Sequence, residues 1–170
     1  MRMLNVYQPG CLAFVEKPGS TADPLCVRLT GLLGKARVHL QLDVGFADVV
    51  SPAPVEMEYP VILPMPAPVL HSYPPETVVA EKLQAMIYLG TVNSRMKDFY
   101  DLWMLANRFE FKGEMLQEAV RRTIECRKTE IPTTEPAAFS AQFAREKQSQ
   151  WRAFLKTCPG YLSYPLFIAS

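Results

Sequence analysis

YPPETVVAEKL, residues 73–83, is the stretch at which this sequence changes from strand-forming to helix-forming. Its two prolines suit the start of a helix, because proline lacks the N–H that the first helical turn leaves unpaired, and the Glu76 carboxylate favours the positive end of the helix. Apolar residues then recur at helical spacing as far as Gly90, a residue typical of helix ends. The stretch therefore predicts a helix that opens at Pro74-Pro75 and stops near Gly90.

The sequence before this stretch reads as β structure. One candidate strand runs from Leu25 to Leu33, and a second runs from Arg37 to Val44 with alternating polar and apolar residues. The Gly34-Lys35 turn between them predicts a hairpin. Asp43 is then the last residue on the polar face of the second strand.

The proline content marks the boundary between the two halves. Eight of the 15 prolines lie between Pro52 and Pro75, which predicts an extended segment that wraps over a surface, since proline cannot donate to a helix or a central strand. Helical spacing predicts further helices up to Cys158. We expect an α+β fold in which residues 1–75 form a β region with a proline-rich wrap and residues 76–170 form a C-terminal helical domain.

The composition is that of an ordinary globular protein, with 49% hydrophobic and 21% charged residues. A net charge of +1 gives no overall attraction to nucleic acid or to a membrane surface, so any nucleic-acid contact needs a local basic patch. Four cysteines without C-x-x-C spacing and two histidines argue against a zinc site. No stretch reaches the ~20 apolar residues of a membrane span, and we expect a cytoplasmic protein.

The densest polar cluster lies in the second predicted helix. Helical geometry places Ser94, Asp98 and Asp101 on one face with Arg95 nearby, and Lys97 lies one turn before Asp101. One interpretation is a solvated helix face, with Ser94 as the N-cap and ion pairs worth a few tenths of a kcal/mol each. The other is that these side chains line a functional cleft.

Two further residues have both a functional and a structural interpretation. Lys82 borders the apolar stripe of its helix, so its packed stem could present a fixed charge to phosphate, or it could be a surface lysine that reaches solvent. Asp43 could hold Mg²⁺ together with other carboxylates, or simply end the strand with a hydrogen bond. Gly19-Ser20 is interpreted as a loop, because no Asp-x-Asp pair follows it or occurs elsewhere.

Several segments, in their order along the chain, resemble those of one family, the AbiEii/AbiGii-type nucleotidyltransferase toxins. Leu40–Asp48 resembles the strand that carries the family's third carboxylate, Tyr73–Leu83 its lysine helix, and Asn93–Leu102 the Arg-x-Lys-Asp-x-x-Asp helix that follows. Gln150–Leu155 resembles a later segment. The resemblance implies a partial polymerase-β-like sheet followed by a helical bundle, and transfer of a nucleotide from an NTP, in some members to tRNA.

The resemblance also implies roles for individual residues. Asp43 would be the third metal carboxylate and a ligand of Mg²⁺. Lys82 would contact the triphosphate, with Arg95 and Lys97 as further phosphate-binding residues. Asp98 and Asp101 would line the same cleft, so that they join Asp43 and Lys82 as the candidate catalytic set.

One departure from the family pattern limits the expected activity. In the family, a Gly-Ser at a helix start followed by an Asp-x-Asp pair precedes the third-carboxylate strand, and this combined motif does not occur here. We therefore expect a truncated member that is inactive by itself. The alternative is a binding module or remnant that interacts with an antitoxin, a nucleotide or RNA without catalysis. An exposed sheet edge would also favour a homodimer.

Overall fold

The computed structural model describes residues 2–4, 11–16, 25–45, 48–62 and 64–157. The chain forms two compact units, Met1–Asp48 and Val49–Ser170, called here the strand unit and the helical unit. Strands make up the first and helices dominate the second, so the expected α+β class is confirmed. The proline-rich segment belongs to the helical unit.

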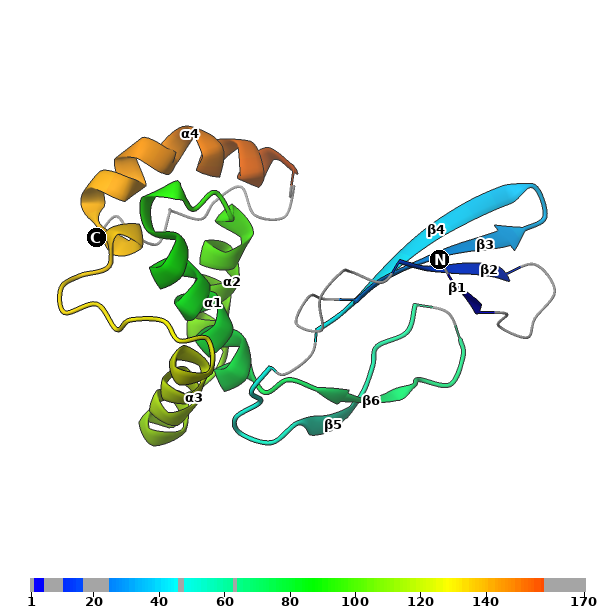
Figure 1. Ribbon diagram of the computed structural model, residues 1–170, viewed down its shortest axis with the longest axis horizontal. Helices are drawn as coiled ribbons and strands as arrows, with labels where there is room; N and C mark the ends of the chain where they lie inside the picture. Colours follow the sequence, from blue (N-terminus) through cyan, green and yellow to red (C-terminus); the bar gives the residue numbers. More distant parts are fainter. Residues whose placement is uncertain (1, 5–10, 17–24, 46–47, 63, 158–170) are drawn as a thin grey trace. The chain divides into compact units, whose positions relative to one another are not determined.

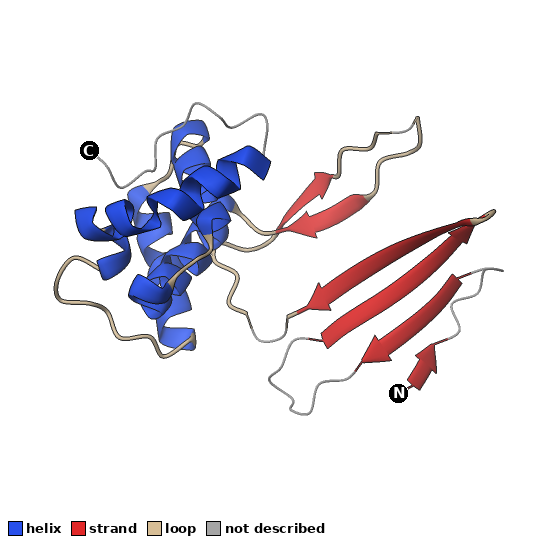
Figure 2. Cartoon of the chain, turned by 90° about the horizontal axis from the view of Figure 1, so that it is seen from above, coloured by secondary structure: helices blue, strands red, loops and turns tan. Residues whose placement is uncertain are grey.

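The strand unit is an antiparallel sheet in which strands adjacent in sequence are adjacent in space (Figure 2). Its members are β1 (Arg2–Leu4), β2 (Cys11–Glu16), β3 (Leu25–Leu33) and β4 (Ala36–Val44). The predicted hairpin is β3–β4, and Gly34 turns it with a φ of 60°, a backbone conformation that glycine adopts without steric cost. Sequence reasoning did not predict β1 and β2.

The pairing of β3 with β4 separates polar from apolar residues. Asp43 lies opposite Cys26, and Thr30 lies opposite His39, with its hydroxyl 3.1 Å from His39 Nδ1. Because directly opposed residues share a face, these side chains form one polar face. Leu40 and Leu42 lie on the other face and are about half exposed. The alternation of polar and apolar residues predicted for Arg37 to Val44, in β4, is confirmed.

In its described residues, the helical unit combines a small hairpin with four α-helices (Figure 1). The hairpin pairs β5 (Val55–Glu58) with β6 (Val69–Ser72), and the helices are α1 (Pro75–Leu89), α2 (Met96–Arg108), α3 (Gly113–Cys126) and α4 (Ala141–Thr157). The Thr77 hydroxyl accepts a hydrogen bond from the Ser51 N–H and donates one to its carbonyl. That reciprocal pair joins the proline-rich segment to the first turn of α1.

The ends of the helices follow from local sequence. Pro75 is the first residue of α1, and the Pro74 carbonyl accepts a hydrogen bond from the Val78 N–H. Gly90 ends α1 with a φ of 50°, and its N–H binds the Met86 carbonyl. At α4, the Ser140 hydroxyl accepts a hydrogen bond from the Phe143 N–H, as an N-cap does.

The core of the helical unit lies where α1, α2 and α4 meet. Its buried apolar side chains include Met86, Phe99, Phe143 and Trp151. The rings of Phe99 and Phe143 stack with their centroids 5.4 Å apart, which joins α2 to α4. This packing fixes α2 next to α1, and the candidate site lies on those two helices.

Candidate functional site

Lys82 of α1 bridges two carboxylates of α2. Its Nζ lies 2.7 Å from Asp98 Oδ1 and 2.8 Å from Asp101 Oδ2. The side chains of Lys82, Asp98 and Asp101 are only 19%, 8% and 14% exposed, respectively. The predicted packed stem of Lys82 is confirmed, and its ammonium group has a fixed position.

Two exposed cations complete this group of charges. Arg95 Nε lies 3.0 Å from Asp98 Oδ2, and Lys97 Nζ lies 2.6 Å from Asp101 Oδ2. The Arg95 and Lys97 side chains are 60% and 72% exposed, respectively. Lys82, Arg95, Lys97, Asp98 and Asp101 are called here the lysine–aspartate cluster. Three cations and two carboxylates leave the cluster with one net positive charge.

Burial and charge act in opposite directions on this cluster. Burial disfavours the charged form of Lys82, but hydrogen bonds to Asp101 and Asp98 outweigh it and raise the pKa of Lys82. Burial likewise opposes ionisation of Asp101, yet hydrogen bonds from Lys82 and Lys97 outweigh it and lower the pKa of that carboxyl. Lys82 therefore stays positive and Asp101 stays negative at neutral pH.

The start of α2 differs from the sequence expectation. The helix begins at Met96, its N-cap position is Arg95 without a side-chain cap, and Ser94 is exposed, so the prediction of Ser94 as the N-cap is wrong. The buried Asn93 takes over part of this role, because its Oδ1 accepts a hydrogen bond from the Arg95 N–H at 2.8 Å. This turn sets the position of Arg95 beside Asp98.

Polar contacts between α1 and the residues that follow α3 were not predicted from the sequence. Gln84 Nε2 donates to Thr129 Oγ1 at 2.7 Å, and Arg127 Nη1 donates to Gln84 Oε1 at 2.9 Å. Arg127 also lies 3.5 Å from Glu81. These contacts hold the helix that carries Lys82. No spacing rule could have found them, since their members are more than forty residues apart.

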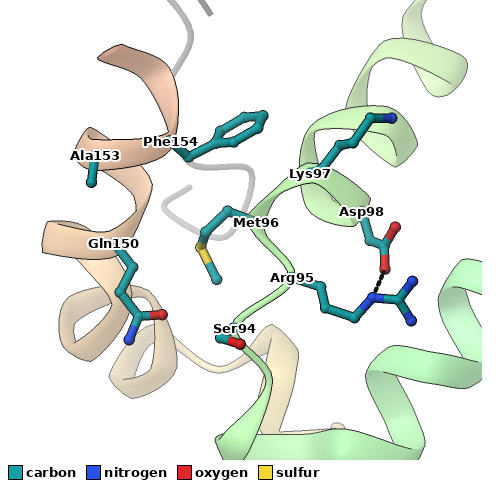
Figure 3. A pocket seen from close by; sticks show the side chains of 8 residues that line it. All are labelled: Ser94, Arg95, Met96, Lys97, Asp98, Gln150, Ala153 and Phe154. Atoms are coloured by element: carbon teal, nitrogen blue, oxygen red, sulfur yellow. Dashed lines mark ion pairs between the residues drawn. The ribbon is translucent and has the colours of Figure 1, made fainter. Parts of the chain in front are cut away.

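An open pocket of about 610 Å³ adjoins the cluster, between the first turn of α2 and helix α4 (Figure 3). Figure 3 shows Arg95 and Lys97 on one side, with Gln150 and Phe154 projecting from α4 on the other. It is called here the α2–α4 pocket, and it is lined by Ser94, Arg95, Met96, Lys97, Asp98, Gln150, Ala153 and Phe154. Asp98, Arg95 and Lys97 belong to both the pocket and the cluster.

Asp43 belongs to the strand unit and has its own local partners. The Gln41 side-chain amide donates to both oxygens of its carboxylate, at 3.0 Å and 3.1 Å. Partial burial raises the pKa of the Cys26 thiol, and the adjacent Asp43 carboxylate adds to that shift. The structure thus brings five of the six candidate site residues together, and Asp43 lies in the other unit.

The carboxylates in the described residues do not fit a complete Mg²⁺ site. Within them, no three His, Cys, Asp or Glu side chains gather as ligands. Asp43 is paired with an amide there, and Asp98 and Asp101 are paired with cations. Since Mg²⁺ needs oxygen ligands in octahedral geometry, the metal role of Asp43 stays a prediction.

Comparison with known proteins adds one finding. The model of a protein family described as "Nucleotidyl transferase AbiEii toxin, Type IV TA system" matches residues 11–167. No curated protein and no solved structure matches the chain. In the described ranges, no helix has the length and apolar character needed to cross a membrane.

Proposed function

The chain belongs to the AbiEii family of nucleotidyl transferase toxins, and on this premise we propose that its lysine–aspartate cluster binds the triphosphate of a nucleoside triphosphate. The observation that carries the proposal is the fixed Lys82 ammonium with two exposed cations, Arg95 and Lys97, beside it. A triphosphate presents several anionic oxygens, and charge-assisted hydrogen bonds to such oxygens are among the strongest in proteins.

The geometry of Lys82 supports this role. An ammonium group has three donors, and the contacts within the described residues direct two of them at Asp98 and Asp101. The third can meet a phosphate oxygen while the carboxylates hold the group in place. Arg95 and Lys97 are largely exposed and pair with the same two carboxylates as Lys82, so they add the mobile part of the phosphate contact.

The two aspartates act in this proposal as positioning residues. A general base must accept a proton near neutral pH, and the lowered pKa of Asp101 makes it a poor acceptor there. Asp98 is the most buried member of the cluster and contacts both Lys82 and Arg95. Together the carboxylates set the direction of the cations and keep like charges apart.

A binding titration tests the proposal. We expect each of the four ribonucleoside triphosphates, with Mg²⁺ present, to bind saturably, and Lys97→Ala to weaken binding about tenfold, roughly 1.5 kcal/mol. Arg95→Ala should have a similar effect. Calorimetry with the full chain measures both, and the variants remove exposed side chains, so the fold should persist.

The matched control is Lys35→Ala, which removes an exposed lysine from the β3–β4 turn. Equal losses from Lys35→Ala and Lys97→Ala would mean that only general charge matters. Absence of saturable binding to the unmodified chain would overturn the proposal.

Transfer itself is expected to be absent from these 170 residues alone. Two-metal transfer needs carboxylates that clamp both ions, and the sequence contains no Asp-x-Asp pair to join Asp43. Incubation with labelled NTPs, Mg²⁺ and tRNA should leave the RNA unlabelled. Robust labelling that Asp43→Ala abolishes and Asp48→Ala preserves would show the opposite, namely that Asp43 works in a complete site.

The family supplies the wider setting of the proposal. Because the family is one of toxins of toxin–antitoxin systems, we propose an RNA such as tRNA as the acceptor and a cognate antitoxin as the partner. Nucleotidyltransferases in general use a divalent metal, so Mg²⁺ is the cofactor we propose for the assembled enzyme. The proposed triphosphate binding by the lysine–aspartate cluster requires neither the RNA acceptor nor the antitoxin.

A further inference from the structure

The α2–α4 pocket has the size and mixed chemistry of a ligand site. Its volume of about 610 Å³ falls within the ~300–1,000 Å³ of small-molecule pockets. Arg95 and Lys97 line the pocket from the α2 side, with their charged ends turned toward Asp98 and Asp101, whereas Phe154 and Gln150 line it from α4 with an aromatic ring and an amide (Figure 3). A ligand that matches both sides carries an anionic part and a flat, hydrogen-bonding organic part.

The pocket and the lysine–aspartate cluster share three side chains. Arg95, Lys97 and Asp98 line the pocket. In the cluster, Asp98 pairs with Arg95 and Lys82, and Lys97 pairs with Asp101. Phosphates held by the cluster therefore bring the rest of their molecule to the pocket. We propose that the α2–α4 pocket holds the nucleoside of the triphosphate, with the base stacked on Phe154. This inference rests on the proposed triphosphate binding.

Phe154 is suited to serve as a fixed stacking surface. It is partly buried, and its ring packs beside Trp151 at a centroid distance of 5.5 Å and beside Tyr100 at 6.2 Å. These neighbours hold the ring, so little entropy is lost when a base stacks on it. Every base has a π-face, and aromatic side chains bind bases by stacking.

Gln150 lies one helical turn before Phe154 and projects from the same side of α4 (Figure 3). Its exposed amide carries both a donor group and an acceptor oxygen, which matches the edge of a nucleobase. Gln150 therefore selects among bases, while Phe154 contributes affinity for all of them. Phosphate affinity comes from the other side of the pocket.

The test compares nucleoside triphosphates with inorganic tripolyphosphate, which has the charge but no nucleoside. Phe154→Leu and Phe154→Ala should weaken NTP binding, the alanine variant by roughly 5- to 150-fold, and leave tripolyphosphate binding unchanged. Gln150→Ala should alter the ranking of the four NTPs. Phe109→Leu is the matched control, since Phe109 is an exposed phenylalanine beyond α2 that does not line the pocket.

The possible outcomes distinguish the pocket assignment from the proposed triphosphate binding. If tripolyphosphate binds and both Phe154 variants bind NTPs normally, the pocket assignment is overturned and triphosphate binding stands. Equal losses for both ligands would assign Phe154 a structural role, and circular dichroism of Phe154→Leu would show it. Weakened binding of a short RNA, with NTP binding intact, would place the acceptor in the pocket instead. If neither phosphate ligand binds, the proposed function fails and this inference fails with it.

Discussion

Replacing Lys82 with methionine is expected to lower the free energy of unfolding of the helical unit by about 3–5 kcal/mol. Methionine keeps the apolar stem but removes the charge that Asp98 and Asp101 share at 2.7 Å and 2.8 Å. Two largely buried carboxylates would then face each other with only the exposed Arg95 and Lys97 to neutralise them. Removing the shared partner leaves uncompensated charge in a poorly solvated place, which is costly.

Urea unfolding, followed by the far-ultraviolet circular dichroism of the helices, measures this loss. The control is Glu110→Ala, which removes an exposed acid between α2 and α3 and should change stability by less than about 0.5 kcal/mol. The triple variant Lys82→Met/Asp98→Asn/Asp101→Asn should regain much of the loss, because it leaves no unpaired charge buried. Arg95 and Lys97 lose their carboxylate partners in it, but both are exposed to solvent. A loss below about 1 kcal/mol for Lys82→Met alone would show that solvent screens the cluster.

The stability that Lys82→Met loses relative to the parent should depend on pH in a characteristic way. The lowered pKa of Asp101 means that its contribution to stability is complete above about pH 4 and is lost as the pH falls through the lowered value. The raised pKa of Lys82 means that its contribution is complete below about pH 10 and is lost as the pH rises through the raised value. The difference between the parent and Lys82→Met should therefore be widest between these limits and narrow outside them.

The parts of the fold that sequence reasoning predicted have strong local signals. The alternation from Arg37 to Val44 and the Gly34 turn specify the β3–β4 hairpin, and Pro74-Pro75 specifies the start of α1. β1, with three residues, is too short for a period to be read from it. The start of α2 was misplaced because Asn93 is an equally good local acceptor, and only the structure shows that it is buried and bonded to Arg95.

The contacts of the candidate site are likewise of two kinds: those that sequence spacing predicts and those that depend on how the helices pack. The Lys97–Asp101 pair follows from a separation of four residues on one helix, and it is present. The bridge from Lys82 to Asp98 joins two helices, so its geometry depends on how α1 packs against α2. The pocket depends further on α4, where Gln150 and Phe154 are more than fifty residues from Arg95. Family resemblance supplied the order of these motifs, whereas tertiary packing supplied their contacts.

The packing that brings α4 to the site leads to a second large effect. Phe99→Ala is expected to destabilise the helical unit by about 3–5 kcal/mol, because Phe99 is 1% exposed and its removal leaves a cavity beside Phe143. Phe99 directly follows Asp98 on α2, and its partner ring lies on α4, so one side chain supports both sides of the pocket. Urea unfolding measures the loss, and Phe109→Ala is the exposed control.

Phe99→Leu separates packing from the mere presence of an apolar group. Leucine refills part of the cavity, so the loss of stability should fall well below that of alanine. If Phe99 fixes α4 against α2, Phe99→Leu should also weaken NTP binding more than tripolyphosphate binding, since the residues proposed to bind phosphate belong to α1 and the start of α2 while Phe154 lies on α4. Equal stability of Phe99→Ala and the parent would mean that the stacking of Phe99 on Phe143 does not hold the two helices together.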